Sequence, residues 1–142
     1  MLFRSGVADL VAVRDDVMQR WLGDGNGGFN YAGDWGPGWT PYAASLTGAG
    51  DMNGDGNGDL VAVRDGCLHK WVGNGSGGFN YVGVVGCGWG PYAATLTGKG
   101  DINSDGGGDL LSTYGDCLHR WYNGAYTYAG TWGCGWGTYP IQ

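Results

Sequence analysis

Asp51-Met52-Asn53-Gly54-Asp55-Gly56-Asn57-Gly58-Asp59 is the stretch from which the fold of this chain can be predicted. Oxygen-bearing side chains stand at its first, third, fifth and ninth positions, and its seventh residue can offer a carbonyl. Calcium takes about six to eight oxygen ligands, and glycines let a backbone turn tightly around the ion. The spacing therefore predicts a calcium-binding loop. The alternative is an Asx-rich β-turn that binds no metal.

The loop recurs fifty residues later as Asp101-Ile102-Asn103-Ser104-Asp105-Gly106-Gly107-Gly108-Asp109, with every side-chain ligand position retained. It differs from a helical EF-hand, because the chain contains no glutamate and the twelfth position from Asp51 is Ala62. The apolar, β-branched run that follows Asp59 is typical of a strand. We therefore expect each loop to join two strands and to hold one structural Ca²⁺ ion.

The loops belong to a longer internal repeat. Its period of fifty residues aligns two series of positions, Leu10, Leu60 and Leu110, and Trp21, Trp71 and Trp121. The third copy loses three residues after Trp121, and a further tryptophan series then brings the copies back into step at Trp39, Trp89 and Trp136. Repeats of this size are typical of arrays, solenoids and propellers.

Each copy reads as four antiparallel strands, which is the pattern of a β-propeller blade. The strands are predicted at Pro91–Thr97, Leu60–Arg64, Cys67–Val72 and Phe79–Val85. The Leu-Val-Ala-Val run is apolar on both faces, which favours a strand enclosed between neighbouring blades. The fold class is therefore predicted to be all-β, with three blades per chain.

The 142 residues are predicted to form a single repeat domain. The predicted limits are about 1–45 for blade 1, 41–90 for blade 2 and 91–137 for blade 3, with a closing strand at 138–142. In the first copy the loop positions are degraded, so we expect no calcium there; they are Met1, Phe3, Ser5, Val7 and Asp9.

The first copy would need its inner strand from the C-terminus of this chain or of a neighbour. Because propellers close at about four to eight blades, three blades predict association of the chain with itself. A two-fold dimer with six blades is the favoured form, since closed symmetric assemblies are the norm. The alternative is that the sequence is a fragment of a longer chain.

The four cysteines are placed in pairs. The second copy has Cys67 and Cys87 and the third has Cys117 and Cys134, whereas the first copy has neither. This pattern predicts the disulfides Cys67–Cys87 and Cys117–Cys134, each closing a loop of about 20 residues and contributing roughly 3 kcal/mol. Disulfides point to an oxidising, extracellular compartment. The alternative is a zinc site that uses His69 and His119, although the chain has no C-x-x-C motif.

The composition of the chain limits the classes of partner that it is expected to bind. The 33 glycines, 8 tryptophans and 9 tyrosines favour short strands joined by tight turns. The formal net charge is −6, and six of the 13 acidic residues lie in the two loops. No basic patch is visible in the sequence, which argues against a nucleic-acid partner. No apolar run approaches about 18 residues, so we expect no membrane insertion.

The loop, the following Leu-Val-Ala-Val-Arg-Asp, the Leu-His-Lys-Trp run and Gly73–Phe79 together resemble the FG-GAP/VCBS-type repeats of secreted bacterial proteins. The resemblance covers nearly the whole chain and implies an integrin-like calcium-binding β-propeller. Such repeats occur in accessory domains of secreted hydrolases, in adhesins and in propeller lectins. The calcium ligands it implies are Asp51, Asn53, Asp55, Asn57 and Asp59 in one loop, and Asp101, Asn103, Asp105, Gly107 and Asp109 in the other.

No set of residues for catalysis is recognisable in the sequence, and we predict that the chain is not an enzyme. Gly23–Gly28 and 73–78 match G-x-G-x-x-G, but a strand rather than a helix follows each, so a dinucleotide site is rejected. Paired glutamates, a His-Glu-x-x-His motif and a serine nucleophile elbow are all missing.

A repeated aromatic motif remains as the candidate for ligand binding. It pairs a tryptophan with a tyrosine three residues later, at Trp39 and Tyr42, Trp89 and Tyr92, and Trp136 and Tyr139. Aromatic rings with nearby polar groups stack on sugars, and repeat-equivalent sites act together. The sequence thus predicts a secreted carbohydrate-binding module. Two alternatives remain: the aromatic residues only fill the space between blades, or the chain is a structural, adhesion or accessory propeller that contacts protein.

Overall fold

The computed structural model describes residues 2–4, 7–122 and 127–141. The described part of the chain is all-β apart from two short 3₁₀ helices. The elements in chain order are β1 (Leu2–Arg4), β2 (Val7–Ala8), β3 (Leu10–Arg14), β4 (Val17–Gly23), β5 (Phe29–Pro37), η1 (Thr40–Tyr42), β6 (Thr47–Gly50), β7 (Asp59–Arg64), β8 (Cys67–Gly73), β9 (Phe79–Cys87), η2 (Gly90–Thr95), β10 (Thr97–Gly100), β11 (Asp109–Tyr114), β12 (Cys117–Tyr122) and β13 (Thr127–Cys134).

Most described residues with a positive φ are glycines. The others are Asp15, Asp16, Asp65, Ser104 and Asp116.

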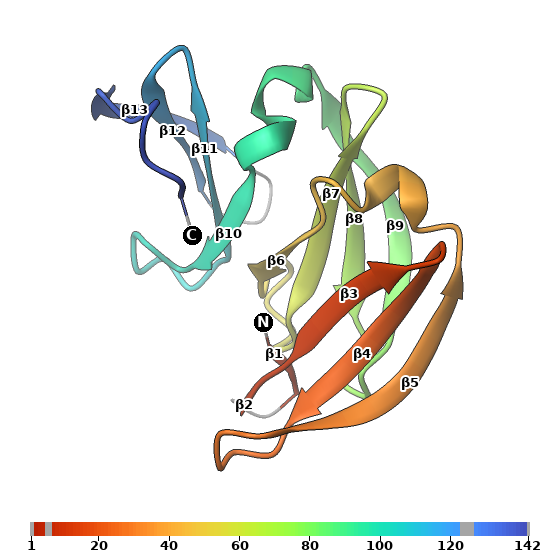
Figure 1. Ribbon diagram of the computed structural model, residues 1–142. Helices are drawn as coiled ribbons and strands as arrows, with labels where there is room; N and C mark the ends of the chain where they lie inside the picture. The colour runs from red at the N-terminus through yellow and green to blue at the C-terminus, as the bar shows by residue number, and fades with distance from the viewer. Residues whose placement is uncertain (1, 5–6, 123–126, 142) are drawn as a thin grey trace.

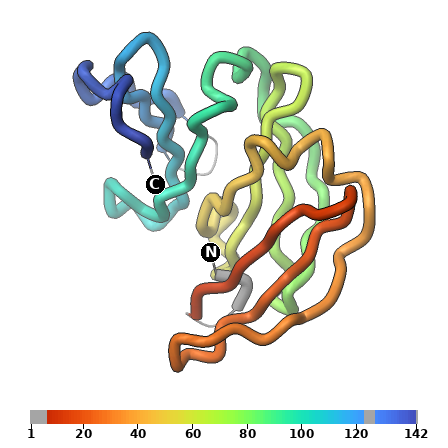
Figure 2. Tube along the Cα trace, in the orientation of Figure 1, coloured from red at the N-terminus to blue at the C-terminus, as the bar shows by residue number. Residues whose placement is uncertain are grey.

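The strands form three successive antiparallel sheets, in each of which strands that are consecutive in the chain are neighbours (Figures 1 and 2). We call β3-β4-β5 sheet I, β6-β7-β8-β9 sheet II and β10-β11-β12-β13 sheet III; β1 and β2 form a separate pair. The sheets share one register, since Leu10 pairs with Trp21, Leu60 with Trp71 and Leu110 with Trp121. Each sheet lies within one of the predicted blade ranges.

Three of the four predicted strands are confirmed, as β7, β8 and β9. The prediction of a strand at Pro91–Thr97 is wrong. Residues Gly90–Thr95 form the 3₁₀ helix η2, and the strand begins only at Thr97. Pro91 sits in the first turn of that helix, where its fixed φ is favourable and its missing N–H costs nothing. Residues 138–141 are not in a strand, and residue 142 lies outside the described residues, so the closing strand stays a prediction.

The core lies between neighbouring sheets rather than within one of them. Strand β7 is enclosed on both faces: Leu60, Val61 and Ala62 are fully buried, as its apolar sequence predicts. Leu110 on β11 is also fully buried, but Leu10 at the same position of sheet I is 49% exposed. The first strand of sheet I therefore lacks the cover that the other two sheets have.

The inner strands β6 and β10 pack backbone against backbone. The N–H of Gly98 donates to Oγ1 of Thr47, 3.1 Å away, and the N–H of Gly108 donates to the carbonyl of Asp51 at 2.8 Å. A Cβ on Gly98 would overlap the carbonyl oxygen of Gly48, and a Cβ on Gly108 would overlap that of Ala49. Glycine at these two positions is what lets sheets II and III approach.

Substituting either glycine is expected to separate the two sheets. Gly98→Ala or Gly108→Ala should lower the free energy of unfolding by about 1–3 kcal/mol, because a backbone must shift to admit the methyl group. Chemical denaturation measures the effect. Gly86→Ala is the matched control, since a Cβ there meets no atom within 4 Å, and it should change stability little. Equal stability of all three variants would contradict the packing described.

The two predicted disulfides are confirmed. Cys67 is bonded to Cys87 and Cys117 to Cys134, and each bond joins directly paired residues on the last two strands of its sheet. All four cysteines are thus used. The zinc alternative loses its thiolate ligands, because a disulfide sulfur cannot serve as a thiolate.

Candidate functional site

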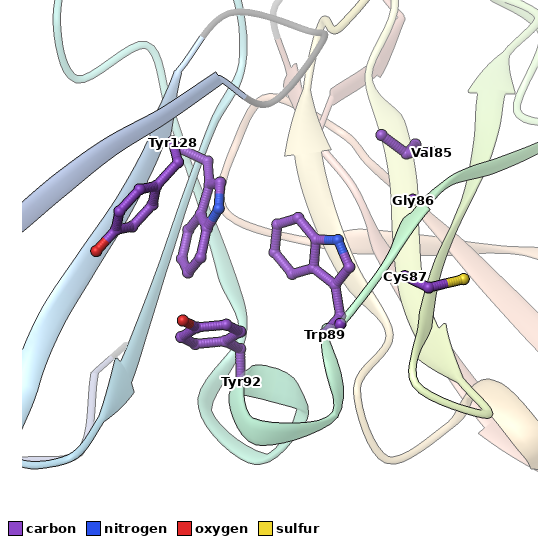
Figure 3. Close-up of a pocket in the computed structure, with 8 residues that line it drawn as sticks. Val85, Gly86, Cys87, Trp89, Tyr92 and Tyr128 are labelled. Carbon is purple, nitrogen blue, oxygen red and sulfur yellow. The ribbon is translucent and has the colours of Figure 1, made fainter.

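Two aromatic pockets lie between neighbouring sheets. Pocket A, between sheets I and II, has a volume of about 340 Å³ and is lined by Trp35, Pro37, Gly38, Trp39, Tyr42, Trp71, Phe79 and Tyr81. Pocket B, between sheets II and III, has a volume of about 370 Å³ and is lined by Val85, Gly86, Cys87, Gly88, Trp89, Tyr92, Trp121 and Tyr128 (Figure 3). None of these lining residues carries a charge.

The pockets are equivalent by repeat. Each contains the predicted tryptophan and tyrosine pair. The next sheet along the chain adds a tryptophan from its third strand and a tyrosine from its fourth strand. Ring geometry repeats as well: Trp39 lies 5.0 Å from Trp71, and Trp89 lies 4.8 Å from Trp121, centroid to centroid. The fold therefore builds the same aromatic site twice.

The two members of the predicted pair differ in exposure. Trp39 and Trp89 are only 6% and 8% exposed, so these rings mainly fill the space between sheets, as one alternative predicted. Tyr42 and Tyr92 are half-buried, and each meets the neighbouring tryptophan edge-on at 4.8 Å. Burial raises the pKa of Tyr92, which keeps its hydroxyl protonated and able to donate a hydrogen bond. The tyrosines are the better candidates for ligand contact.

A histidine and tyrosine pair flanks each pocket. Nδ1 of His69 lies 2.8 Å from the hydroxyl of Tyr81, and Nδ1 of His119 lies 2.9 Å from that of Tyr128. Nε2 of His119 donates to the carbonyl of Tyr114 at 3.1 Å. In the neutral imidazole this leaves Nδ1 as the acceptor, so the Tyr128 hydroxyl is the donor. These contacts fix the orientation of the tyrosine rings at the pocket edge.

The third aromatic pair is placed differently. Trp136 and Tyr139 lie at the end of sheet III with centroids 6.1 Å apart, nearly the spacing of the other two pairs. Tyr139 is 64% exposed. The structure does not place this pair in either pocket, so its role as a ligand site stays a prediction.

Asp16 is a positioning residue that sequence reasoning missed. Its carboxylate accepts the N–H groups of Gly38 and Thr40, each at 2.9 Å, and its carbonyl accepts that of Trp39. These hydrogen bonds fix the position of residues 38–40, and Trp39 of this segment lines pocket A. Asp116 holds the equivalent segment of sheet III through Gly135 and Gly137. The sequence held one signal for this role, because Asp16 and Asp116 occupy equivalent positions in the first and third copies of the repeat.

Acidification should release this segment. The hydrogen bond from Thr40 lowers the pKa of Asp16 below 3.8, so the carboxylate stabilises the fold above that value and stops doing so as the pH falls through its lower folded pKa. Asp16→Asn should therefore lower the melting temperature at neutral pH, and the difference from wild type should shrink only as the pH falls below 3.8 through the lower folded pKa of Asp16. Asp15→Asn is the control, since among the described residues the Asp15 carboxylate forms an exposed ion pair with Arg14 and does not hold the Trp39 segment. A pH-independent difference would contradict this role.

The two acidic loops adopt one conformation. Oδ2 of the first aspartate accepts the N–H of the sixth residue, from Gly56 at 2.7 Å in one loop and from Gly106 at 2.8 Å in the other. The Asn53 side chain lowers the pKa of Asp55, and the Gly106 N–H lowers that of Asp101, so these carboxyls are charged at neutral pH. An all-oxygen, charged donor set fits a hard divalent cation. Among the described residues, no three acidic, histidine or cysteine side chains gather into a metal-binding cluster.

The ninth aspartate has a structural role in each copy. Asp59 is fully buried, and its two carboxylate oxygens accept the N–H groups of Met52 at 2.8 Å and Gly73 at 2.9 Å. Burial raises the pKa of Asp59. Asp9, in the copy whose loop is degraded, makes the same bond to Gly23 at 2.8 Å. This explains why the first copy keeps an aspartate here, while calcium ligation by Asp59 and Asp109 stays a prediction.

Comparison of the sequence with models of known protein families finds no match, and a search of curated proteins finds none. Within the described part of the chain, no helix is long and apolar enough to cross a membrane. The function must therefore be argued from the residues themselves.

Proposed function

We propose that this chain is a secreted, non-catalytic binding module, built as a calcium-stabilised β-propeller of the FG-GAP/VCBS type, and that it binds carbohydrate. The single observation that carries the proposal is the pair of equivalent, uncharged aromatic pockets between neighbouring sheets. Sugars present apolar faces that stack on aromatic rings and hydroxyls that need hydrogen-bond partners. The two disulfides support an extracellular location.

The chemistry of the pockets favours a neutral sugar. Tyr42 and Tyr92 offer half-buried rings, and the hydroxyls of Tyr81 and Tyr128 offer polar groups at the edge. No lining residue bears a charge that would select a phosphate, a carboxylate or an amine. Two equivalent sites per chain would bind a multivalent glycan surface more tightly than one site alone.

In this proposal calcium has a structural task. Asp51, Asn53, Asp55, Asp59 and the carbonyl of Asn57 would hold one ion, and their equivalents in the second loop would hold another. A bound cation would offset the repulsion among the aspartates of each loop and tie it to the strands on either side. The ligand pockets need no metal of their own.

A glycan array with labelled protein, run with calcium present, tests the function. We expect binding to glycans with accessible neutral sugars, reduced by the same free sugars in competition. Absence of binding by folded protein would overturn the carbohydrate assignment. It would favour the second candidate, a propeller that contacts protein, for which the exposed Val82, Val84 and Val85 of β9 offer an apolar surface.

A further inference from the structure

The contact between sheets I and II depends on an arginine and tryptophan pair. The Arg20 guanidinium lies over the Trp35 ring, 5.0 Å from its centroid, and donates to the carbonyl of Gly77. The Trp35 ring lies so close to Gly78 that a Cβ there would overlap it. Phe79, the next residue, is only 4% exposed. Arg20 and Trp35 of sheet I thus pack against the Gly-Gly-Phe hairpin of sheet II.

The same pair recurs on sheet III. Arg120 lies over Trp132 at 5.1 Å, and its Nη2 donates to the carbonyl of Ala129, as that of Arg20 does to Ala32. Trp132 is nevertheless 64% exposed. Within the described residues, Nε of Arg120 is the one buried side-chain nitrogen or oxygen without a hydrogen-bond partner. Nη1 of Arg20 donates to the hairpin of the next sheet, whereas Nη1 of Arg120 donates to the hydroxyl of Tyr122 on its own strand, 2.9 Å away. Among the described residues, the Arg120 and Trp132 pair makes no hydrogen bond or cation–π contact to another sheet.

The sequence indicates that the arginine and tryptophan pair should pack against a Gly-Gly-Phe hairpin. Sheet II has Lys70 and Val85 in place of the arginine and tryptophan, and the hairpin of the sheet that follows it lacks Gly-Gly-Phe. The pair and the Gly-Gly-Phe hairpin thus occur together. One such hairpin is left over, at 27–29 on sheet I. Its Phe29 is 48% exposed, and the hairpin is already formed, with Asp24 N–H donating to the Gly28 carbonyl at 3.0 Å.

Each end of the chain also carries half of an aromatic pocket. Trp136 and Tyr139 on sheet III are 6.1 Å apart at 68°, as Trp89 and Tyr92 are 6.1 Å apart at 69° in pocket B. On sheet I, the rings of Trp21 and Tyr31 are 5.6 Å apart at 51°. The equivalent rings in pocket B, Trp121 and Tyr128, are 5.5 Å apart at 50°. The tyrosines of the two halves are exposed, Tyr31 at 57% and Tyr139 at 64%.

We propose that sheet III of one copy packs on sheet I of a second copy, so that Arg120 and Trp132 grip the Gly27–Phe29 hairpin and Trp136 closes a third aromatic pocket with Trp21. Two copies joined twice in this way make a closed ring of six sheets, within the range in which propellers close. The inference rests on the proposed propeller arrangement and extends its ligand sites to three per chain. The third site is incomplete without the partner copy.

Solution mass tests the interface without any ligand, so its outcome is independent of the glycan array. Wild type should have twice the 14.8 kDa of one chain by light scattering. Trp132→Ala and Phe29→Ala alter opposite faces, and each should raise the dimer Kd at least about a hundredfold, because the dimer contains the interface twice. Val82→Ala is the control, since Val82 is 55% exposed but lies on neither face, and it should leave the mass unchanged.

Circular dichroism would show that the variants are folded, as expected for exposed side chains. An equal mixture of Trp132→Ala and Phe29→Ala retains one intact interface per pair and should recover part of the dimer. A wild-type mass of one chain at all concentrations would overturn the proposal, as would variants of both faces that keep the wild-type mass.

Discussion

Chelation of calcium is expected to lower the melting temperature of the protein by roughly 15 °C. A ligand present at about 100 times its Kd stabilises a fold by about 2.7 kcal/mol per site, and the chain has two candidate loops. For a domain of this size, each kcal/mol corresponds to roughly 3 °C. Without the ion, the charged aspartates of each loop repel one another. Differential scanning calorimetry with calcium and with a chelator measures the shift.

Substitutions in the two loops test whether the change in melting temperature comes from calcium bound there. Asp51→Ala and Asp101→Ala should each lower the melting temperature in calcium and leave about half of the chelator effect, because one loop remains intact. Asp34→Ala, outside the loops, should keep the full effect. Asp59 and Asp109 are unsuitable for this test, since both are fully buried and their loss would destabilise the fold with or without metal. If the chelator changes nothing, the loops are only turns.

Removing the half-buried tyrosines should strongly weaken glycan binding at both pockets. Tyr92 contacts Trp89, Trp121 and His119, and its ring forms one wall of pocket B. Truncation of such an aromatic residue typically costs about 2 kcal/mol or more, which corresponds to a roughly 30-fold weaker Kd at that site. Tyr42→Ala should do the same at pocket A, and the double variant should lose the gain from multivalency as well.

Tyr42→Phe and Tyr92→Phe are the matched controls. They keep the ring and remove only the hydroxyl, so they separate stacking from hydrogen bonding and should retain most of the affinity. Binding to an immobilised glycan from the array, measured by biolayer interferometry, gives the comparison. A double Tyr→Ala variant that is folded and binds as wild type does would contradict the location of the sites.

Much of the fold could be predicted because the repeat imposes the same physical pattern more than once. The Leu-Val-Ala-Val run predicted an enclosed strand, and β7 is buried on both faces. Paired gain of cysteines predicted both disulfides. The error at Pro91–Thr97 has a local cause: Trp89 is held by the Gly66 carbonyl, which leaves the following residues to turn as a 3₁₀ helix.

The site was harder to predict, because its residues come from different copies. The motif identified Trp39 and Tyr42, but pocket A is completed by Trp71 and Tyr81 from the next sheet. Only the packing of sheets I and II brings them together. The same holds for Arg20 and its hairpin contact, since neither the arginine nor the glycines suggest a partner in sequence alone.

The most direct test of whether the pockets between sheets bind sugar is to measure which tryptophan indole signals change when sugar is added. Indole ¹H–¹⁵N spectra would be recorded while glucose, galactose, mannose and N-acetylglucosamine are added in turn, with assignments made by substitution. We predict that at least one of these sugars causes saturable shifts in signals of the tryptophans that line the two pockets, which are Trp35, Trp39, Trp71, Trp89 and Trp121. Saturable shifts confined to other tryptophans, or no shift with any of the four sugars, would contradict the account.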